Sequence, residues 1–560
     1  MKLKNWVLFL ALSLLLSVSL AACSGEESST TDGSEDEGKK EETASGEKVL
    51  NFTNPEAIPS MDPSLATDES SFIYLAATTE GLYRLDEETQ PSDGIATEHE
   101  VSEDGLTWTF TLREDAVWSN GDPVTAHDFV YAWQRAVNPD TGSEYGPYMM
   151  NGVIKNATAV STGEAPVEEL GVKADGDYKL VVELENPTPY FETLTTFGTF
   201  LPLNQAFVEE KGEDFATNSD NLLSNGPYKI TNWNSTSNSW ELVKNEDYWD
   251  AETVNMDKLT FQVVKDPQTA LALYEEGTVQ RIDLTSDLVD QFAADDDYNV
   301  SADTFVYFLK FNQTTTEALA NKNIRAAISR AFDKEALVNE ILNNGSIAAN
   351  GLVPKDFTPM PETGEDFREV SGDLVTSDIE AAKEFWAKGL EELGTDSVEL
   401  EFLADDDETT KTLIQYVANQ LSTNLEGLKI NVKQVPKEQR LDLDTKMDYE
   451  LQLTRWGPDF LDPFTYMNLF ITDGGNNMTG YSSEAYDKLV TETATTYATD
   501  NVARYKNFLE AEKLLFEDAV IAPVYQASRA QLISPTVEGV FVNPFGATYE
   551  YKWTDVGTAE

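Results

Sequence analysis

Val117-Trp-Ser-Asn-Gly-Asp-Pro-Val-Thr-Ala-His-Asp-Phe-Val-Tyr-Ala-Trp133 is the stretch of sequence that decides the fold. It contains Asn120-Gly-Asp-Pro123, a combination of residues that favours a turn. Thr125 follows with the short polar side chain of a helix N-cap, and apolar residues then recur at helical spacing from Ala126 to Val137. The stretch therefore predicts a turn that leads into a capped, amphipathic helix.

Strands and helices alternate on both sides of this stretch, without a tandem repeat. Thr107-Trp-Thr-Phe-Thr-Leu-Arg113 alternates on a period of two, which predicts a strand that begins after a tight turn at Asp104-Gly105. Similar strand patterns occur at Val49–Thr53, Lys179–Glu185 and Tyr307–Asn312, and helical patterns at Asn323–Leu342 with a local start signal at Asp333, Ile379–Leu393, Lys411–Leu425 and Asn501–Phe516. Over 560 residues, this mixture predicts an α/β or mixed α+β fold with about two to four domains or a few large lobes.

The charge balance argues against nucleic acid as a partner. The chain has 39 Lys and Arg against 100 Asp and Glu, which gives a formal net charge of −61. A phosphate backbone is bound by neutralising its charge with Lys and Arg, so this surface would repel it. Neutral or cationic ligands fit better, although solubility in salty or alkaline surroundings explains the acidity at least as well.

Few residues are available for catalysis by a metal or a nucleophile. Cys23 is the only cysteine, which excludes a disulfide framework and every multi-cysteine metal site. A Ser-His-Asp triad would need His99 or His127, the only histidines, and His127 lies where a helix is predicted to start, which is usually a surface position. No phosphate-binding loop is present. We therefore expect no enzyme activity, no cofactor and no metal.

The N-terminal residues 1–47 have the pattern of a targeting segment and a tether. Two lysines precede an apolar run that is typical of a signal peptide and short for a membrane span. The run ends Leu20-Ala-Ala-Cys23, which resembles the bacterial lipobox, in which the cysteine is acylated; an ordinary secretory signal with a chance cysteine is the alternative. Residues 24–47 are polar, which predicts a flexible acidic stalk. Two or more acyl chains, palmitate included, would anchor the protein on the outer face of a cell membrane, an arrangement that suits a Gram-positive cell.

Several further runs, together with residues 117–133, closely resemble the family-5 extracellular solute-binding proteins, and most of all the oligopeptide-binding proteins of bacterial ABC importers. These runs are Ser102–Arg113, Leu170–Lys173, Asn186–Phe191, Asn225–Ile230, Tyr248–Trp249, Asn323–Ala327 and Pro523–Tyr525. The resemblance implies a two-lobed, periplasmic-binding-protein-like fold (type II, cluster C) with an additional domain. It places lobe I in residues 48–92, 206–303 and 527–560, the additional domain in 93–205 and lobe II in 304–526.

The resemblance also implies a function. A member of this family binds short peptides between its lobes and delivers them to the transmembrane and ATPase subunits of an ABC permease, and we expect this chain to do so as a monomer. A dedicated receptor for one signalling peptide, such as a pheromone, on the same scaffold stays open. A secreted, cell-tethered peptidase is the alternative from another class, and it would need a nucleophile with a base or a metal.

The resemblance places the ligand site in Leu451-Gln-Leu-Thr-Arg-Trp-Gly-Pro-Asp-Phe-Leu-Asp-Pro463. In the resembled proteins a Trp-x-x-Asp segment carries the aspartate that pairs with the terminal ammonium of the peptide. The matching residues here are Trp456 and Asp459, with Gly457 between them. The chemistry is sound because a receptor for peptides of any sequence must hold the main chain and the charged ends. A turn aspartate is the structural alternative for Asp459, and we expect Asp462 to be structural.

Further residues are weaker candidates for contact with the ligand. Arg455 either meets a ligand carboxylate or is stacked or paired with acidic residues. Tyr145 and Tyr148, and the Gly81-Leu82 segment, match positions near the peptide in the resembled family. The acidic runs at 295–297 and 405–408 lack the glycine and closing glutamate of a calcium loop, so we expect them to be solvated surface.

Overall fold

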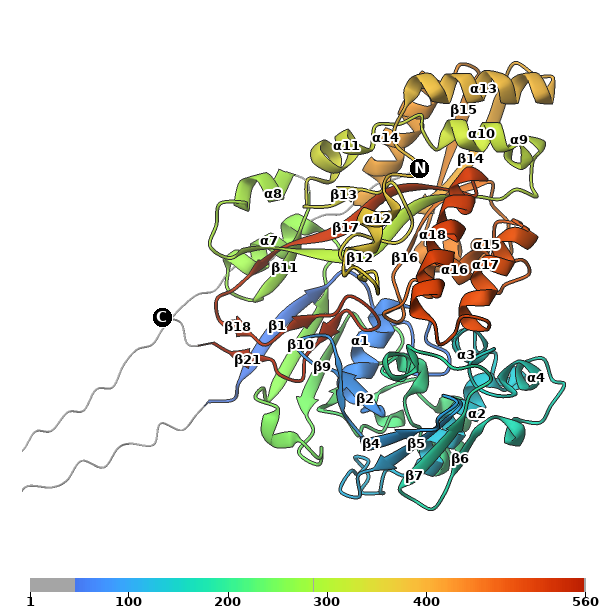
Figure 1. Cartoon of the computed structure of the whole chain (residues 1–560). Helices are drawn as coiled ribbons and strands as arrows, with labels where there is room; N and C mark the ends of the chain where they lie inside the picture. The colour runs from blue at the N-terminus through green and yellow to red at the C-terminus, as the bar shows by residue number, and fades with distance from the viewer. Residues whose placement is uncertain (1–45, 286, 558–560) are drawn as a thin grey trace, which may run out of the picture. The chain divides into compact units, whose positions relative to one another are not determined.

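The computed structural model describes residues 46–285 and 287–557 (Figure 1). Glu47–Glu560 form one compact unit. The signal peptide, Cys23 and the stalk up to residue 45 lie outside the described residues. Helices and strands are mixed along the chain, which confirms the predicted fold class. Within the described ranges, we find no helix with the length and apolar character needed to cross a bilayer.

A sheet of eleven strands is the largest element of the fold. Its strand order is β15-β14-β16-β12-β17-β11-β1-β10-β9-β8, and β13 pairs with β17 beside this path. The bounds are β1 Val49–Asn54, β8 Tyr228–Thr231, β9 Ser239–Lys244, β10 Lys258–Val263, β11 Arg281–Leu284, β12 Tyr298–Phe311, β13 Ile347–Ala348, β14 Val398–Asp405, β15 Leu428–Val435, β16 Leu451–Trp456 and β17 Ile521–Ile533. Several neighbouring strands of this sheet therefore come from distant parts of the chain.

Two long antiparallel strands, β12 and β17, join the halves of this sheet (Figure 1). The end of β17 pairs with β11, whereas β12 pairs with β16 from Val306 to Phe311. We call the part with β11, β1, β10, β9 and β8 the β1 side, and the part with β16, β14 and β15 the β16 side. The register of β12 on β17 is interrupted between Ala302 and Val306, which is where the chain passes from one side to the other.

The β1 side carries the helix α1 (Glu69–Thr78) and adjoins a smaller sheet. The order of that sheet is β4-β5-β7-β6, with bounds β4 Ala96–Val101, β5 Thr107–Leu112, β6 Val172–Ala174 and β7 Lys179–Glu183. Trp108, Phe110 and Leu112 of β5 are buried on one face, as the alternation predicts. The helix α2 (Ala126–Val137) begins at Thr125 with a capping box, which confirms the predicted N-cap. The small sheet, α2 and the β1 side share one apolar core.

Helices cover the β16 side and form two further apolar clusters. Their bounds are α10 Lys322–Ile328, α13 Ile379–Leu393, α14 Glu408–Asn424, α16 Phe464–Met467, α17 Glu484–Ala494 and α18 Asn501–Glu517. The helical pattern over 323–342 forms more than one helix, and the predicted start signal at Asp333 is confirmed. α10 ends at Ile328, and α11 (Lys334–Ala336) starts anew and leads into a π-helical turn, because the Asp333 side chain accepts a hydrogen bond from the N–H of Ala336. The acidic run 405–408 is also not only solvated surface, since Asp407 caps α14 and Asp405 pairs with Arg440.

Candidate functional site

Asp459 lies just beyond the end of β16, where elements distant in sequence enclose it. Only 5% of its surface is exposed. Its Oδ2 accepts a hydrogen bond of 3.0 Å from the hydroxyl of Tyr148, on α3 (Tyr145–Met150). Its backbone N–H donates to Thr465 Oγ1 over 3.2 Å, at the start of α16. α3 packs in the apolar core of the β1 side, whereas Asp459 and Thr465 follow β16. Residues of both the β1 side and the β16 side therefore cover the carboxyl group.

The carboxyl group of Asp459 has no cationic partner within residues 46–285 and 287–557. Burial raises its pKa to about 7, and the hydrogen bonds from Tyr148 and Thr465 only partly oppose that rise. Among the described residues, no lysine, arginine or histidine contributes to its charge balance. A buried carboxylate without a cation is strongly disfavoured in its charged form. The site is therefore suited to take up either a proton or a cationic group of a ligand.

Aromatic rings line the surroundings of this carboxyl group. The ring of Tyr148 meets Trp456 edge-on with centroids 5.9 Å apart, and it meets Tyr145 at 5.6 Å. Tyr145 in turn stacks on Phe197 with centroids 5.6 Å apart. Burial and the negative charge of Asp459 both raise the pKa of Tyr145 and Tyr148. Both phenols therefore stay protonated at neutral pH, and Tyr148 remains a hydrogen-bond donor.

The strand β16 has an unpaired edge next to Asp459. Its pairing with β12 runs to Trp456, but its pairing with the parallel strand β14 covers only Leu451 and Gln452. In the described part of the chain, no other strand pairs with residues 453–456 on that edge. Unpaired backbone N–H and C=O groups at a sheet edge can pair with an added extended chain.

Gly457 has no room for a side chain. A Cβ atom at this position would lie 2.4–2.8 Å from three ring atoms of Phe305. Phe305 comes from the interrupted stretch of β12, so its ring reaches across the end of β16. The glycine therefore permits the backbone next to Asp459 to pass close under an aromatic ring.

Arg455 joins an ionic cluster with Glu69 and Arg529. Its Nη1 donates to the hydroxyl of Tyr307 over 3.0 Å, and its guanidinium lies 4.7 Å from the ring centroid of Phe305. Its Nη2 lies 3.3 Å from a carboxylate oxygen of Glu69 on α1, and Arg529 Nη2 binds the same carboxylate at 2.7 Å. Burial disfavours the charged form of Glu69, but the two arginines outweigh it and lower its pKa to about 2. In this structure Arg455 is thus paired with an internal acid.

Three further contacts join the two sides of the sheet around this site. Lys437, at the start of α15 (Lys437–Thr445), pairs with Glu56 at 2.9 Å. The rings of Tyr190 and Phe460 stack with centroids 4.4 Å apart. The N–H of Gly546 donates to the carbonyl oxygen of Pro458 over 3.1 Å. The end of β16 is therefore closed in by the β1 side and by the region of the small sheet.

Gly81 and Leu82 lie on the β1 side, and Leu82 belongs to the apolar core against which Tyr145 and Tyr148 pack. Leu82 has no exposed surface, and its carbonyl oxygen accepts hydrogen bonds from Gly94 and Ala96. Gly81 lines a separate pocket on the β1 side. In the structure Leu82 is part of the apolar core, and contact of Gly81 and Leu82 with a ligand stays a prediction.

Other polar candidates have structural roles. Asp462 is buried and binds the guanidinium of Arg504 through both carboxylate oxygens, at 2.9 and 3.0 Å. His127 is exposed and lies 3.6 Å from Asp177. Within the described residues, no group of three or more His, Cys, Asp or Glu side chains is placed to hold a metal ion.

Three residues of the site were missed by the sequence analysis. Thr465 follows Asp459 by six positions and has no motif of its own. Glu69 stands in the first turn of α1, a position that is equally explained by the helix dipole. Phe305 lies in a strand that the sequence pattern begins only at Tyr307. No local signal distinguishes any of the three from ordinary structural residues.

The comparisons with known proteins agree with this geometry. Residues 90–478 match the model described as "Bacterial extracellular solute-binding proteins, family 5 Middle". A dipeptide-binding protein of Lactococcus lactis is 33% identical over 91% of this chain and 94% of its own length. The oligopeptide-binding protein OppA of Bacillus subtilis is 32% identical over 98% of each chain. The chain belongs to the bacterial extracellular solute-binding proteins of family 5.

Solved structures show the same architecture. The structure titled "Listeria monocytogenes OppA bound to peptide" has a TM-score of 0.86 and 41% identity, over 92% of this chain and 100% of that one. The structure of the pheromone receptor PrgZ also has a TM-score of 0.86, with 35% identity over 92% and 100% of the two chains. These similarities confirm a two-lobed fold of the periplasmic-binding-protein type.

Proposed function

We propose that this chain is a lipid-anchored extracellular receptor that binds oligopeptides at the end of β16 and delivers them to an ABC permease. The family consists of solute-binding proteins, and the relatives described above are named for dipeptides and oligopeptides. The permease is the partner that membership of such an importer system implies. A monomer is expected, because one chain contains both sides of the site.

The observation that carries this proposal is that a buried carboxyl group and an unpaired strand edge lie next to each other. In the described part of the chain, the buried carboxyl group of Asp459 has no cation beside it, and the adjacent edge of β16 has backbone groups without a partner strand. A peptide in extended form supplies both complements, because its terminal ammonium pairs with Asp459 and its main chain pairs with the strand. Neither interaction depends on the peptide's side chains, so binding would be broad.

Closing of the two sides around the ligand is part of the proposal. The contacts Glu56–Lys437 and Tyr148–Asp459 both cross between the two sides. Such contacts form only when the sides approach, and a peptide that bridges them would favour the closed arrangement. Small-angle scattering should show compaction when a peptide that also raises the melting temperature is added.

Mass spectrometry tests the proposed ligand class directly. Protein purified from its own host is denatured, and the released small molecules are sequenced. We expect a mixture of short peptides with free amino ends, followed by calorimetric binding of synthetic copies. Absence of peptides from the released material, together with no heat of binding for any peptide of a random library, would reject the receptor function.

A dedicated pheromone receptor is the second candidate. The similarity to PrgZ, at 35% identity over nearly the whole of both chains, favours it specifically. The random library separates the two functions, because a receptor for nutrition retains a broad set of peptides whereas a pheromone receptor retains one.

A further inference from the structure

The backbone amide unit that joins Pro458 to Asp459 is held from both sides of the sheet. Its oxygen, the carbonyl oxygen of Pro458, accepts a hydrogen bond of 3.1 Å from the N–H of Gly546. Its N–H, which belongs to Asp459, donates to Thr465 Oγ1 over 3.2 Å. Because an amide unit is planar, hydrogen bonds at both of its ends fix the orientation of the whole plane. The plane ends at Cα of Asp459, so its orientation sets where the Asp459 side chain begins.

Gly546 lies in the tip of a hairpin near the C-terminal end of the described residues. The strands β19 (Phe541–Val542) and β20 (Tyr549–Glu550) pair antiparallel, and residues 543–548 between them form the hairpin tip. Gly546 has a φ of 67°, a left-handed conformation that glycine adopts freely and most other residues disfavour. Among the described residues, a Cβ atom added here would meet only the ring of Phe197, at 3.7 Å. The conformation, and not a lack of space, therefore favours glycine.

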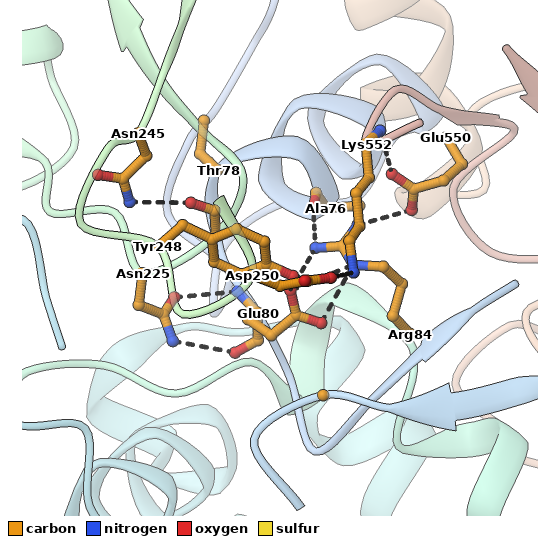
Figure 2. Close-up of polar contacts among 12 residues, drawn as sticks. Ala76, Thr78, Glu80, Arg84, Asn225, Asn245, Tyr248, Asp250, Glu550 and Lys552 are labelled. Carbon is orange, nitrogen blue, oxygen red and sulfur yellow. Dashed lines mark hydrogen bonds and ion pairs between the residues drawn. The ribbon is translucent and has the colours of Figure 1, made fainter. Parts of the chain in front are cut away.

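The base of this hairpin is anchored on the β1 side. Figure 2 shows Glu550, the last residue of β20, bound to Arg84 at 2.6 Å, and Lys552 bound to Asp250 at 2.7 Å. The side chains of Arg84 and Glu550 are only 5% and 4% exposed, so water screens their ion pair little. Arg84 also binds Glu80 at 3.0 Å. The hairpin is therefore part of the β1 side, whereas the amide unit that its tip contacts belongs to the β16 side.

Two further contacts of the hairpin tip involve residues at the junction of the two sides. The hydroxyl of Thr304, in the interrupted stretch of β12, donates to the carbonyl oxygen of Pro544. The hydroxyl of Thr548 donates to the carboxylate of Glu69, which Arg455 of β16 approaches to 3.3 Å. The hairpin tip thus contacts the stretch where the chain passes from one side to the other. Its contact with the amide unit therefore depends on how the two sides lie.

We propose that Gly546 is a positioning residue for peptide binding, because its N–H orients the amide unit before Asp459 when the β1 side closes on the β16 side. This role rests on the proposed function, in which the Asp459 carboxylate pairs with the amino end of a peptide. In an open arrangement the carbonyl group of Pro458 faces water, and Thr465 alone holds the amide unit. Closing then both buries the carboxylate and directs it at the peptide ammonium. The preference for a charged amino end thereby depends on the hairpin tip.

Calorimetry with matched peptides tests this positioning. Each peptide is measured with a free and with an N-acetylated amino end, and the ratio of the acetylated to the free-amine dissociation constant reports how well Asp459 meets the ammonium. Gly546→Val should lower this ratio by about five- to thirty-fold, because a β-branched residue strongly disfavours the left-handed conformation. A residue that only held the two sides together would weaken both peptides alike. A parent ratio in a folded Gly546→Val variant would therefore overturn the proposal.

Three further variants separate positioning from damage to the fold. Gly546→Asn should keep most of the parent ratio, because asparagine tolerates the left-handed conformation. Thr304→Val removes the hydroxyl that holds the tip at Pro544 without straining the backbone, and it should lower the ratio as well. Gly163→Val, the same change at an exposed glycine with a φ of 75° and open space around it, should keep the parent ratio. Melting temperatures without peptide report whether each variant folds.

The remaining outcomes are also decisive. If Gly546→Val does not fold, Thr304→Val decides alone, and a parent ratio in that variant overturns the proposal. If the parent binds free-amine and acetylated peptides equally, Asp459 is not the anchor and the positioning role of Gly546 falls with it. If the parent binds no peptide at all, the receptor function itself is rejected.

Discussion

The hydroxyl of Tyr148 donates a hydrogen bond of 3.0 Å to Oδ2 of Asp459, although the two residues are 311 positions apart. This contact brings α3 to the end of β16 and buries a carboxyl group for which the described residues supply no cation. Tyr148 solvates the carboxylate only in part, because one neutral hydrogen bond replaces a full shell of water. The remaining stabilisation comes either from a proton or, in the proposed function, from the ammonium group of a peptide.

Replacing Asp459 by Asn should weaken the binding of free-amine peptides by about 2–5 kcal/mol, or roughly thirty- to several-thousand-fold. The amide keeps the shape of the side chain but removes the charge opposite the peptide ammonium. N-acetylation of the peptide removes the charge from the other partner and should cost a similar amount. The two changes together should cost clearly less than their sum. Calorimetry on the four combinations measures the coupling.

Asp396→Asn, the same change at an exposed position, serves as the control and should leave the affinity unchanged. Equal binding of free-amine peptides by parent and Asp459→Asn, or equal binding of acetylated peptides by the parent, would show that Asp459 is not the anchor.

Gly457→Ala should also weaken peptide binding. The added methyl group would lie within 2.8 Å of the Phe305 ring, so either the ring or the end of β16 must shift, at a cost of about 1–3 kcal/mol. Asp459 would move with the backbone two residues away. Shortening the ring in the double variant Gly457→Ala/Phe305→Leu should recover part of the affinity. A double variant that binds no better than Gly457→Ala would indicate that the contact with Phe305 is not the cause.

Local patterns were sufficient to predict several elements of the fold. β5 and α2 follow from the alternation of Trp108 and Phe110 and from the cap at Thr125, because these signals act within a few residues. Asp459 and Trp456 were found because they lie in one short motif. The partners of Asp459 and Arg455 were not predictable from local pattern, since Tyr148 and Glu69 reach them only through the tertiary fold. Within the helical pattern over 323–342 only Asp333 marked the start of a new helix, because the apolar spacing continues across the break.

Two arginines bind Glu69, and they should differ in their contribution to stability. Arg529 binds Glu69 at 2.7 Å and Asp303 at 2.8 Å, so Arg529→Met leaves two largely buried carboxylates without their main partner. We expect a loss of about 3 kcal/mol in the free energy of unfolding. Arg455 lies farther from Glu69, at 3.3 Å, and a third of its side chain is exposed, so Arg455→Met should cost about 1 kcal/mol or less. Urea unfolding of the peptide-free variants measures both, and the reverse order would contradict this assignment.

Cys23→Ser should release the protein from the cell into the medium. Cys23 is the proposed point of acylation, and in this proposal the apolar run before it is removed as a signal peptide. Fractionation of cells and medium with an antibody to the protein measures the distribution. A serine elsewhere in the stalk, such as Ser28, replaced by Ala serves as the control and should stay with the cells. Retention of Cys23→Ser on the membrane would reject the lipid anchor.

The affinity for free-amine peptides should depend on pH through Asp459. Burial raises the pKa of this carboxyl to about 7 in the peptide-free protein, so below that pH a proton occupies the place of the peptide ammonium. Affinity should therefore fall as the pH drops below about 7, approaching ten-fold per pH unit, and it should fall again above about 8 as the peptide amine loses its own proton.

The same titration affects the stability of the peptide-free protein with the opposite sign. Because the folded pKa lies above the unfolded value of 3.8, the folded protein holds a proton between about pH 4 and pH 7 that the unfolded chain has lost. Stability should thus decrease as the pH rises through this window, by at most about 1.4 kcal/mol per pH unit. Asp459→Asn should remove this decrease and the acid-side loss of affinity together. Calorimetry from about pH 5.5 to about pH 8.5, in two buffers with different ionisation enthalpies, counts the protons released on binding. An affinity that is constant below pH 7, or a parent profile that persists in Asp459→Asn, would show that Asp459 does not exchange a proton for the peptide.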